Sequence, residues 1–261
     1  MNRIQNLFAA SRRSGRKIFA AYLTMGFPDM EISRRAVEAL IENGADIIEF
    51  GVPFSDPMAD GPVIREAGRK SLERGTTLES VLATIAPLRG KYPQTPFVLF
   101  SYYNVLFSRG LEKFASEAEA AGVDAVLAVD VVLEDRAELL SVLRAHGMTL
   151  VPLVAPTTPL ERVAEIAKGV EDSFLYAITV KGVTGARTEL PPELEQRLGE
   201  IKSVSGMPVL AGFGVSTPRQ AEMIGHAADG FIVGSAIVRI LLDHPDESGV
   251  EELGRFAASF R

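Results

Sequence analysis

Short apolar runs alternate with longer amphipathic stretches along most of the chain. The runs are rich in Val, Ile, Leu and Phe, which is typical of strands buried on both faces of a parallel sheet. The longer stretches repeat apolar residues at three- and four-residue spacing, which predicts helices with one buried face. The predicted strands cover residues 18–23, 47–51, 97–101, 125–129, 150–154, 174–178, 209–211 and 231–233. The predicted helices cover residues 31–43, 62–74, 78–88, 111–121, 133–145, 160–168, 192–203 and 218–225, with an amphipathic helix near the N-terminus and a helical C-terminal segment.

Three of the helix-to-strand junctions resemble one another. NGADIIEFG from Asn43, AGVDAVLAVD from Ala121 and HAADGFIVGS from His226 each place a small turn and an Asp before an apolar strand. This weak internal repeat and eight strand–helix units favour a closed barrel over an open doubly wound sheet. We therefore expect a single eight-stranded parallel β/α (TIM) barrel domain over residues 1–261, with an extra N-terminal helix.

The composition excludes several classes of function. The net charge of −7, with Lys and Arg scattered along the chain, disfavours nucleic acid as a partner. The chain has no Cys, which excludes thiolate metal sites and fits a reducing compartment. No apolar run approaches the ~20 residues of a membrane span, and the N-terminal segment lacks the apolar core of a secretory signal. We expect a cytoplasmic protein without a membrane or nucleic-acid partner.

Three carboxyl groups follow one another at the end of the second predicted strand, in IIEFGVPFSDPMADG. Glu49 lies among apolar residues, so its carboxyl group must be paired, protonated or used in chemistry. We favour a general acid or base over a buried ion pair, because no Arg precedes Glu49 on the same strand. Asp56 and Asp60 follow in the loop, where each taken alone could cap a turn or a helix. Asp130, at the end of the fourth strand, is either a carboxylate at the mouth of the barrel or a helix-entry acid.

Histidine chemistry has little support in this sequence. His146 and His226 precede strands, at the end of a barrel that provides stability, and His244 lies in the closing segment. Hydrolytic triads and His-based metal sites are therefore disfavoured, and we expect no metal site. We therefore expect carboxylates and tyrosines to act as the general acids and bases.

Two glycine-containing loops predict a binding site for a small anion. Gly212-Phe213-Gly214 follows the seventh strand, and Gly234-Ser235 follows the eighth at the start of a helix, where free backbone N–H groups attract phosphate. The loop GVTG at 182–185 adds a third set of donors or forms a lid. Lys181 beside it is either a solvated residue or a Schiff-base lysine, which would make this a different kind of aldolase.

The stretch GVPFSDPMADGP closely resembles the signature of the tryptophan synthase alpha subunit family. The resemblance extends through YLTMGFPD, LVAPTTPLER, KGVTGAR, GFGVSTPRQ and GSAIV, and so covers nearly the whole chain. It implies a lyase that cleaves indole-3-glycerol phosphate to indole and glyceraldehyde 3-phosphate, with Glu49 and Asp60 as the catalytic pair. The substrate-binding residues that it implies are Tyr176, Thr184, Gly185, Phe213, Gly214, Gly234 and Ser235.

A carboxyl pair suffices for this reaction. A protonated Glu49 donates a proton to indole C3, which turns the ring into an electron sink for cleavage of the bond to the glycerol carbon. Asp60 stays ionised, accepts the indole N–H and stabilises the positive charge that develops on nitrogen, so one pKa should be high and the other low. The walls of the indole site expected from position alone are Tyr22, Phe100, Tyr102, Leu127 and Leu153.

The resemblance also implies a partner. It implies no cofactor in this chain and a tryptophan synthase beta subunit that carries pyridoxal phosphate, in an α2β2 heterotetramer. The sequence departs from the family pattern at Val105 and Val132, where Pro is frequent, and at Lys181, and these departures bear on the fit to a partner. Two alternatives stay open: a Schiff-base sugar-phosphate aldolase using Lys181, and a non-catalytic phosphate-ligand-binding regulatory subunit.

Overall fold

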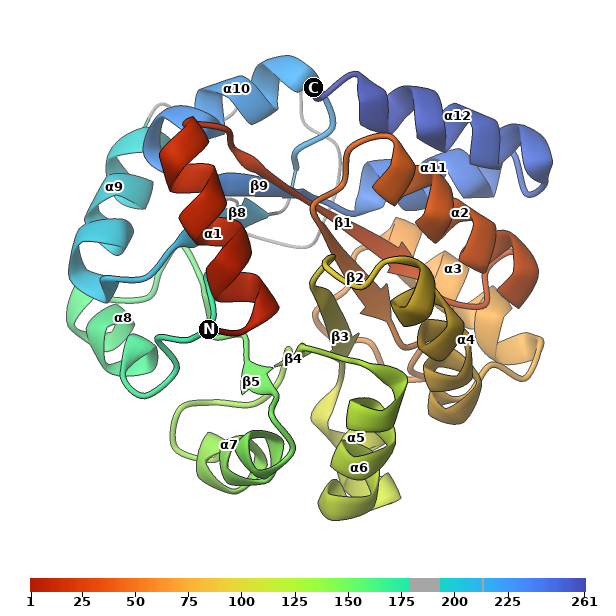
Figure 1. Ribbon diagram of the computed structural model, residues 1–261, viewed down its shortest axis with the longest axis horizontal. Coiled ribbons are helices and arrows are strands. Elements are labelled where there is room, and N and C mark those ends of the chain that lie inside the picture. Colours follow the sequence, from red (N-terminus) through yellow and green to blue (C-terminus); the bar gives the residue numbers. More distant parts are fainter. Residues whose placement is uncertain (179–192, 213) are drawn as a thin grey trace.

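Strands and helices alternate along the computed structural model, which describes residues 1–178, 193–212 and 214–261 (Figure 1). The strands in these ranges are β1 (Ile18–Thr24), β2 (Ile47–Gly51), β3 (Phe97–Ser101), β4 (Ala125–Ala128), β5 (Thr149–Leu150), β6 (Leu153–Val154), β7 (Leu175–Ile178), β8 (Val209–Gly212) and β9 (Gly230–Val233). The helices are α1 (Arg3–Ser14), α2 (Met30–Glu42), α3 (Pro62–Glu73), α4 (Leu78–Lys91), α5 (Tyr103–Arg109), α6 (Leu111–Ala121), α7 (Arg136–Ala145), α8 (Leu160–Ala167), α9 (Leu194–Ser205), α10 (Pro218–Ala227), α11 (Ser235–Asp243) and α12 (Glu247–Ala258).

The sheet closes on itself through the segment that contains β5 and β6. These two short strands are consecutive in the chain but lie at opposite ends of the strand order β5-β4-β3-β2-β1-β9-β8-β7-β6. Between them, the Val151 N–H donates to the Val126 carbonyl of β4 at 2.8 Å, and the Pro152 carbonyl accepts from the Tyr176 N–H of β7 at 2.9 Å. The predicted strand 150–154 is therefore one strand in two pieces, interrupted where proline offers no N–H. The prediction of an eight-stranded parallel barrel is confirmed.

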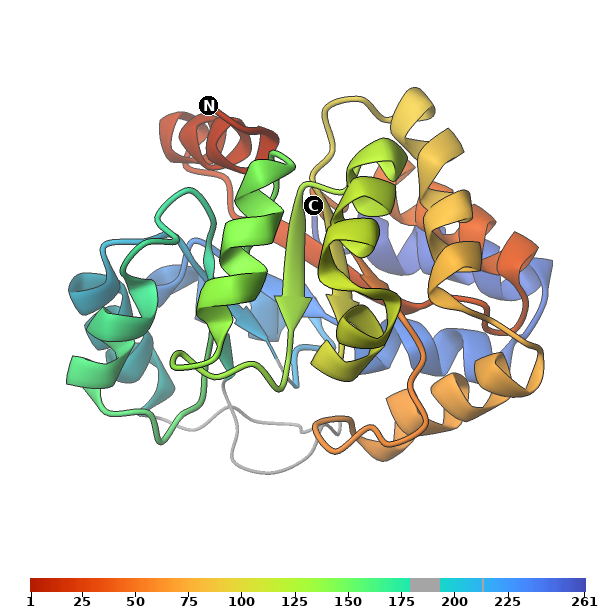
Figure 2. The same ribbon diagram turned by 90° about the horizontal axis from the view of Figure 1, so that it is seen from below.

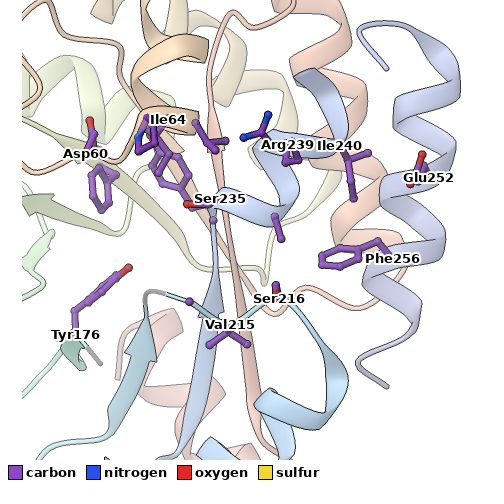
Figure 3. A pocket seen from close by; sticks show the side chains of 17 residues that line it. Asp60, Ile64, Tyr176, Val215, Ser216, Ser235, Arg239, Ile240, Glu252 and Phe256 are labelled. Carbon is purple, nitrogen blue, oxygen red and sulfur yellow. The ribbon is translucent and has the colours of Figure 1, made fainter. Parts of the chain in front are cut away.

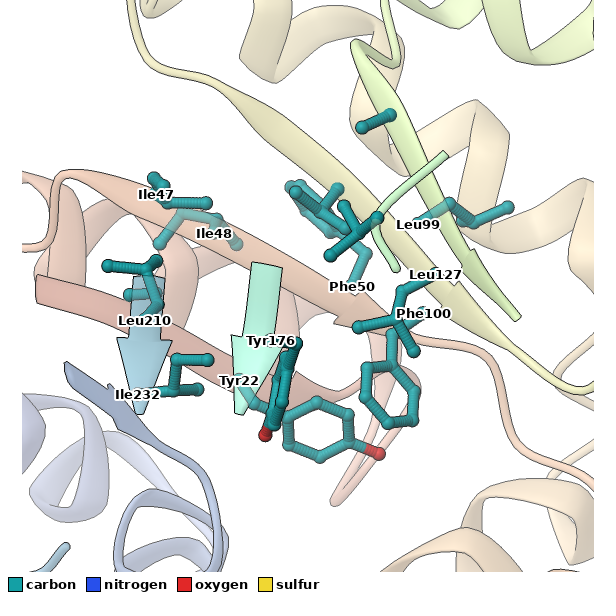
Figure 4. Packing of buried hydrophobic residues seen from close by; sticks show 14 of the residues in the cluster. Tyr22, Ile47, Ile48, Phe50, Leu99, Phe100, Leu127, Tyr176, Leu210 and Ile232 are labelled. Atoms are coloured by element: carbon teal, nitrogen blue, oxygen red, sulfur yellow. The ribbon is translucent and has the colours of Figure 1, made fainter. Parts of the chain in front are cut away.

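The helices form a ring outside the strands, so the strands are covered on both faces (Figure 1). Every residue of β1 and β2 is buried, including Glu49, as expected for predominantly apolar strands that are covered on both faces. Figure 4 shows Tyr22, Phe100 and Tyr176 close together, beyond the apolar packing of Ile47 and Ile48. The barrel interior therefore changes from aliphatic to aromatic toward the C-terminal ends of the strands.

Helix α1 covers the N-terminal end of the barrel, opposite to the strand arrowheads (Figure 2). Its Phe8 ring lies 5.9 Å from that of Phe174, and its Arg3 guanidinium donates to Asp124 at 2.7 Å. The extra N-terminal helix is confirmed, and its position leaves the opposite end of the barrel as the mouth. No helix in the described ranges is long and apolar enough to cross a membrane.

The Asp of the repeated junction makes the same kinds of contact in each of its three copies. Its carboxylate accepts the backbone N–H at the start of a neighbouring strand and pairs with a basic side chain. The N–H donors and basic partners are Phe19 and Arg16 for Asp46, Phe97 and Arg89 for Asp124, and Val209 and Lys202 for Asp229. The repeat is therefore a device that joins strands at the N-terminal end of the barrel.

The sequence pattern does not predict α5. This helix has no side-chain cap of its own, and its first N–H, at Tyr103, donates to Asp130 from the next βα loop at 2.7 Å. Because this capping group lies 27 residues away in the chain, no local signal marks the start of the helix. Asp130 is thus a helix-entry acid, but for α5 and not for α7, which begins at Arg136.

Candidate active site

A cavity of about 460 Å³ opens at the mouth of the barrel (Figure 3). Figure 3 shows Asp60 and Tyr176 on one side of Ser235, and Arg239 and Phe256 on the other. The cavity therefore extends from the strand ends past the start of α11. Its lining is Tyr22, Asp60, Pro62, Val63, Ile64, Phe100, Tyr176, Gly214, Val215, Ser216, Gly234, Ser235, Ala236, Arg239, Ile240, Glu252 and Phe256.

Glu49 is fully buried in the barrel wall. It lies on β2, in register with Tyr22 of β1 and Val98 of β3, and its side chain has no exposed surface. Neither carboxyl oxygen has a hydrogen-bond partner in the part of the chain that the structure describes, and no Arg in that part pairs with it. Burial raises the pKa of Glu49 to about 8, because water no longer stabilises the charged form. Glu49 therefore holds a proton at neutral pH.

Asp60 is half-buried and lines the cavity from the loop between β2 and α3. Burial raises the pKa of its carboxyl group to about 6, while a hydrogen bond from Tyr102 and the charge of Arg65 act in the opposite direction. The sequence predicts a low pKa for Asp60, whereas burial places it above the ordinary value. The pKa of Asp60 still lies below that of Glu49, as expected, so Asp60 is mostly ionised at neutral pH and Glu49 is mostly protonated.

The two carboxyl groups act on the same two tyrosines. Burial raises the pKa of Tyr22 and of Tyr176 well above the usual value, and the charges of both Asp60 and Glu49 raise it further. Both tyrosine rings line the cavity, although Glu49 itself does not. The acids that the sequence places in one strand and its loop therefore act at one place, beside Tyr22 and Tyr176.

Two glycines make room for these tyrosine rings. A Cβ atom on Gly51 would lie 2.3 Å from the Tyr22 hydroxyl oxygen, and one on Gly212 would lie 2.5 Å from that of Tyr176. The Tyr22 ring also meets the Phe100 ring edge-on, with centroids 5.0 Å apart. Sequence reasoning interprets Gly51 only as the end of a strand. The period-two alternation of side chains shows that a residue faces the interior, but not that a neighbouring ring needs its volume.

One end of the cavity lies at the N-terminus of α11, where the sequence predicts an anion site. The N-cap residue is Gly234, and no side chain in the described part of the chain caps the first N–H groups of the helix, which is the arrangement that favours an anion. Gly214 lies in the same lining, as predicted. Arg239 is a lining residue that sequence reasoning missed. Its position four residues after Ser235 is a usable signal, because helical side chains lean over the preceding turn.

Some predicted site residues are not in the described lining of this cavity. The lining of this cavity does not include Tyr102, Leu127 or Leu153. Tyr102 contacts the loop that carries Asp60, Leu127 is fully buried in β4, and Leu153 lines a separate cavity of about 350 Å³. Lys181, Thr184, Gly185 and Phe213 lie outside the described residues.

The remaining polar candidates have structural partners. Asp56 is exposed and accepts a hydrogen bond from Ser55 at 2.5 Å. His146 meets Glu119 at 2.7 Å, and His244 meets Glu252 at 3.4 Å. Among the described residues, no group of three or more His, Cys, Asp or Glu could hold a metal ion. Within the described ranges, Glu49 and Asp60 are the two acids at the mouth whose pKa is raised by burial.

Comparison with known proteins agrees with this geometry. The model of one family, described as tryptophan synthase alpha chain, matches residues 8–259. The chain belongs to the tryptophan synthase alpha chain family. Among curated relatives, the tryptophan synthase alpha chain of Citrifermentans bemidjiense is 41% identical over 261 residues, covering 100% of this chain and 97% of the relative.

Solved structures of the family share the fold. The tryptophan synthase alpha chain of Legionella pneumophila superposes with a TM-score of 0.90 at 30% identity, covering 100% of this chain and 96% of that one. Tryptophan synthase from M. tuberculosis in an aminoacrylate-bound form gives a TM-score of 0.87 at 31% identity, with 100% of both chains covered. The barrel described above is therefore the barrel of this family.

Proposed function

We propose that Glu49 and Asp60 catalyse the alpha reaction of tryptophan synthase in this chain, the cleavage of indole-3-glycerol phosphate to indole and D-glyceraldehyde 3-phosphate. Family membership supports this lyase reaction, which belongs to tryptophan biosynthesis. One observation carries the assignment of residues: a buried acid that is protonated at neutral pH and a half-buried acid that is ionised there act on the same tyrosines at one cavity.

The proton inventory of the pair fits the reaction. Glu49 donates its proton to indole C3, and the bond from C3 to the glycerol carbon then breaks with its electrons returning to the ring. The ionised Asp60 accepts the hydrogen bond of the indole N–H, which stabilises the positive charge on nitrogen. The carboxylate left on Glu49 takes the proton of the glycerol hydroxyl as the aldehyde forms, so Glu49 ends the cycle protonated. The reaction needs no cofactor in this chain.

The cavity provides a place for each end of the substrate. Its volume of about 460 Å³ lies within the range of small-molecule sites. The aromatic end, at Tyr22, Phe100 and Tyr176, suits the flat indole ring. The free N–H groups and the dipole of α11 suit the phosphate, with Arg239 adding a positive charge on the same wall.

A beta subunit is the partner that we propose, in an α2β2 heterotetramer with pyridoxal phosphate on the beta subunit. Apolar side chains are exposed on the segments after three adjacent strands: Met58 after β2, Phe107 after β3 and Val132 after β4, with 88%, 58% and 52% of their surface accessible. Exposed apolar groups that lie close together are typical of protein interfaces. Tryptophan synthase from M. tuberculosis is among the matched structures, which supports a partner of this kind.

The partner proposal is tested by light scattering after gel filtration of mixed alpha and beta chains. Phe107→Glu should weaken the complex, because it places a charge among the apolar side chains. Met223→Glu is the matched control, since Met223 is also exposed but lies on α10. Equal complex formation by both variants would reject this surface as the interface.

The catalytic proposal is tested by indole release from indole-3-glycerol phosphate, with and without a beta subunit. Glu49→Gln should abolish release, because the amide cannot donate a proton to carbon, and Asp60→Asn should reduce it severely. Asp56→Asn, which changes an exposed acid in the same loop, should retain activity in the isolated chain. No indole from the wild type in either condition would reject the function. Trapping of substrate by borohydride on Lys181 would instead favour the Schiff-base aldolase.

A further inference from the structure

Tyr102 holds the loop that carries Asp60 at two points. The residue follows β3, and only 4% of its surface is exposed. Its ring stacks on that of Phe54, with centroids 4.9 Å apart and planes 28° apart. Its hydroxyl oxygen accepts the backbone N–H of Ala59 at 3.0 Å. Both contacts belong to the segment between β2 and α3, and the second one is made by the residue directly before Asp60.

The same hydroxyl group also affects Asp60, the residue after Ala59. A tyrosine hydroxyl has one proton to donate, and the Ala59 N–H uses only acceptor capacity. The Tyr102 phenol, which the Ala59 contact holds next to Asp60, lowers the pKa of the Asp60 carboxyl group. Burial, followed by the charge of Asp60, raises the pKa of Tyr102, so the hydroxyl remains a donor throughout the working pH range. A donor to a carboxylate favours its ionised form, which is the form that the indole N–H requires.

We propose that Tyr102 is a positioning residue for Asp60: its ring holds the loop, and its hydroxyl links the Ala59 backbone to the carboxylate. This role is distinct from the predicted role of Tyr102 as a wall of the indole site, and it fits the position of Tyr102 outside the described lining of the cavity. The inference rests on the proposed function, because it explains how the acid assigned to the indole nitrogen is kept in place and ionised.

Other ionisable groups act on the same carboxylate from neighbouring elements, and the substitution Tyr102→Phe leaves them in place. Arg65 on α3 favours the ionised form of Asp60. The other groups that interact electrostatically with Asp60 or with Tyr102 are Tyr22 on β1, Tyr176 on β7 and Asp130 in the loop after β4, while Glu49 on β2 acts on the two cavity tyrosines. The Tyr22 hydroxyl group lies 3.4 Å from the Thr24 hydroxyl group, and Tyr102→Phe leaves this contact unchanged.

The test is the pH dependence of kcat/KM for indole release by the wild type and Tyr102→Phe. The variant keeps the ring and its stacking on Phe54 but loses the hydroxyl. Without the donor the pKa of Asp60 rises, so the acid limb of the profile should move to higher pH by on the order of one unit. The basic limb, which reports Glu49, should not move. A merely structural role would lower the whole profile without moving either limb.

Two control variants separate the hydroxyl from its surroundings. Tyr103→Phe removes the neighbouring phenol, whose contacts are with Phe107 and with acids of the next segment, and it should leave the acid limb in place. Phe54→Leu removes the stacked ring but keeps the Tyr102 hydroxyl. Because it loosens the loop that carries Asp60, this variant should raise KM but should move the acid limb of the pH profile less than Tyr102→Phe does.

A second readout does not depend on activity. The ¹³C chemical shift of the Asp60 carboxyl carbon, followed as a function of pH, gives its pKa directly in both proteins. A higher pKa in Tyr102→Phe supports the inference even if the variant turns over too slowly to assay. Identical titrations in the two proteins overturn it. If the titration moves but the wild type releases no indole, the link between Tyr102 and Asp60 stands and the proposed function fails.

Discussion

Glu49→Gln should stabilise the protein relative to the wild type by an amount that grows with pH. The wild-type carboxyl group is fully buried and has no hydrogen-bond partner among the described residues. The folded state therefore holds its proton more tightly than the unfolded state does. The resulting contribution to stability is complete below the ordinary pKa of 4.5 and is lost as the pH rises to about 8. Glutamine has the same shape and no proton to lose.

The magnitude follows from these two pKa values. Each pH unit between 4.5 and about 8 changes the free energy of unfolding of the wild type, relative to the variant, by about 1.4 kcal/mol. Over the whole interval the difference between the two proteins should grow by ~5 kcal/mol, and then remain constant above pH 8. This is a large part of the 5–15 kcal/mol that is typical of the net stability of a folded protein.

The assay is urea unfolding of both proteins at unit intervals from pH 4 to pH 9. The difference between the two free energies of unfolding at each pH removes the contribution of groups that titrate equally in both proteins. Glu31→Gln is a control, because Glu31 is exposed and its pKa is lowered by Arg34, so its difference should not grow toward high pH. A constant difference between Glu49→Gln and the wild type would refute the reasoning, since it would mean that Glu49 is ionised in the folded protein at neutral pH.

Two further predictions concern other parts of the barrel. Gly51→Ala should lower kcat/KM for indole release roughly tenfold or more, because the new methyl group displaces the Tyr22 ring toward the cavity; a wild-type value would show that the ring position does not matter. Asp124→Ala should lower the free energy of unfolding by ~3 kcal/mol, since it removes the partner of the partly buried Arg89 and the acceptor of the Phe97 N–H. Urea unfolding measures this loss, and unchanged indole release at low temperature would confirm that the change is confined to the N-terminal end of the barrel.

Much of the fold could be predicted from periodicity, because each β/α unit buries its own apolar pattern. The bounds of β2 and β3 agree with the sequence pattern, since both are short, predominantly apolar runs that end at Gly51 or Ser101. The break of the fifth strand at Pro152 was not predicted, although its cause, the missing N–H of proline, is local. The existence of α5 could not be predicted, because the start of this helix depends on a hydrogen bond to Asp130, far away in the chain.

Some residues of the candidate site could be predicted from the sequence alone, and others could not. Glu49 stands out because a carboxyl group in an apolar strand conflicts with its surroundings. Asp60 has an ordinary explanation as a loop acid, so only the family resemblance singles it out before the structure is known. The contact of Tyr102 with Asp60 was not predictable, since it joins two loops and depends on the direction of a side chain. The need for glycine at position 51, next to the Tyr22 ring, could not be predicted for the same reason.

The most direct test of the account is the pH profile of kcat/KM for indole release by the wild-type chain. This quantity reports the essential groups of the free enzyme. With Asp60 acting as the ionised partner and Glu49 as the protonated donor, the profile should rise through pH of about 6 and fall through pH of about 8. A rate that continued to rise above pH 8 would contradict the assignment of Glu49 as the acid that protonates indole.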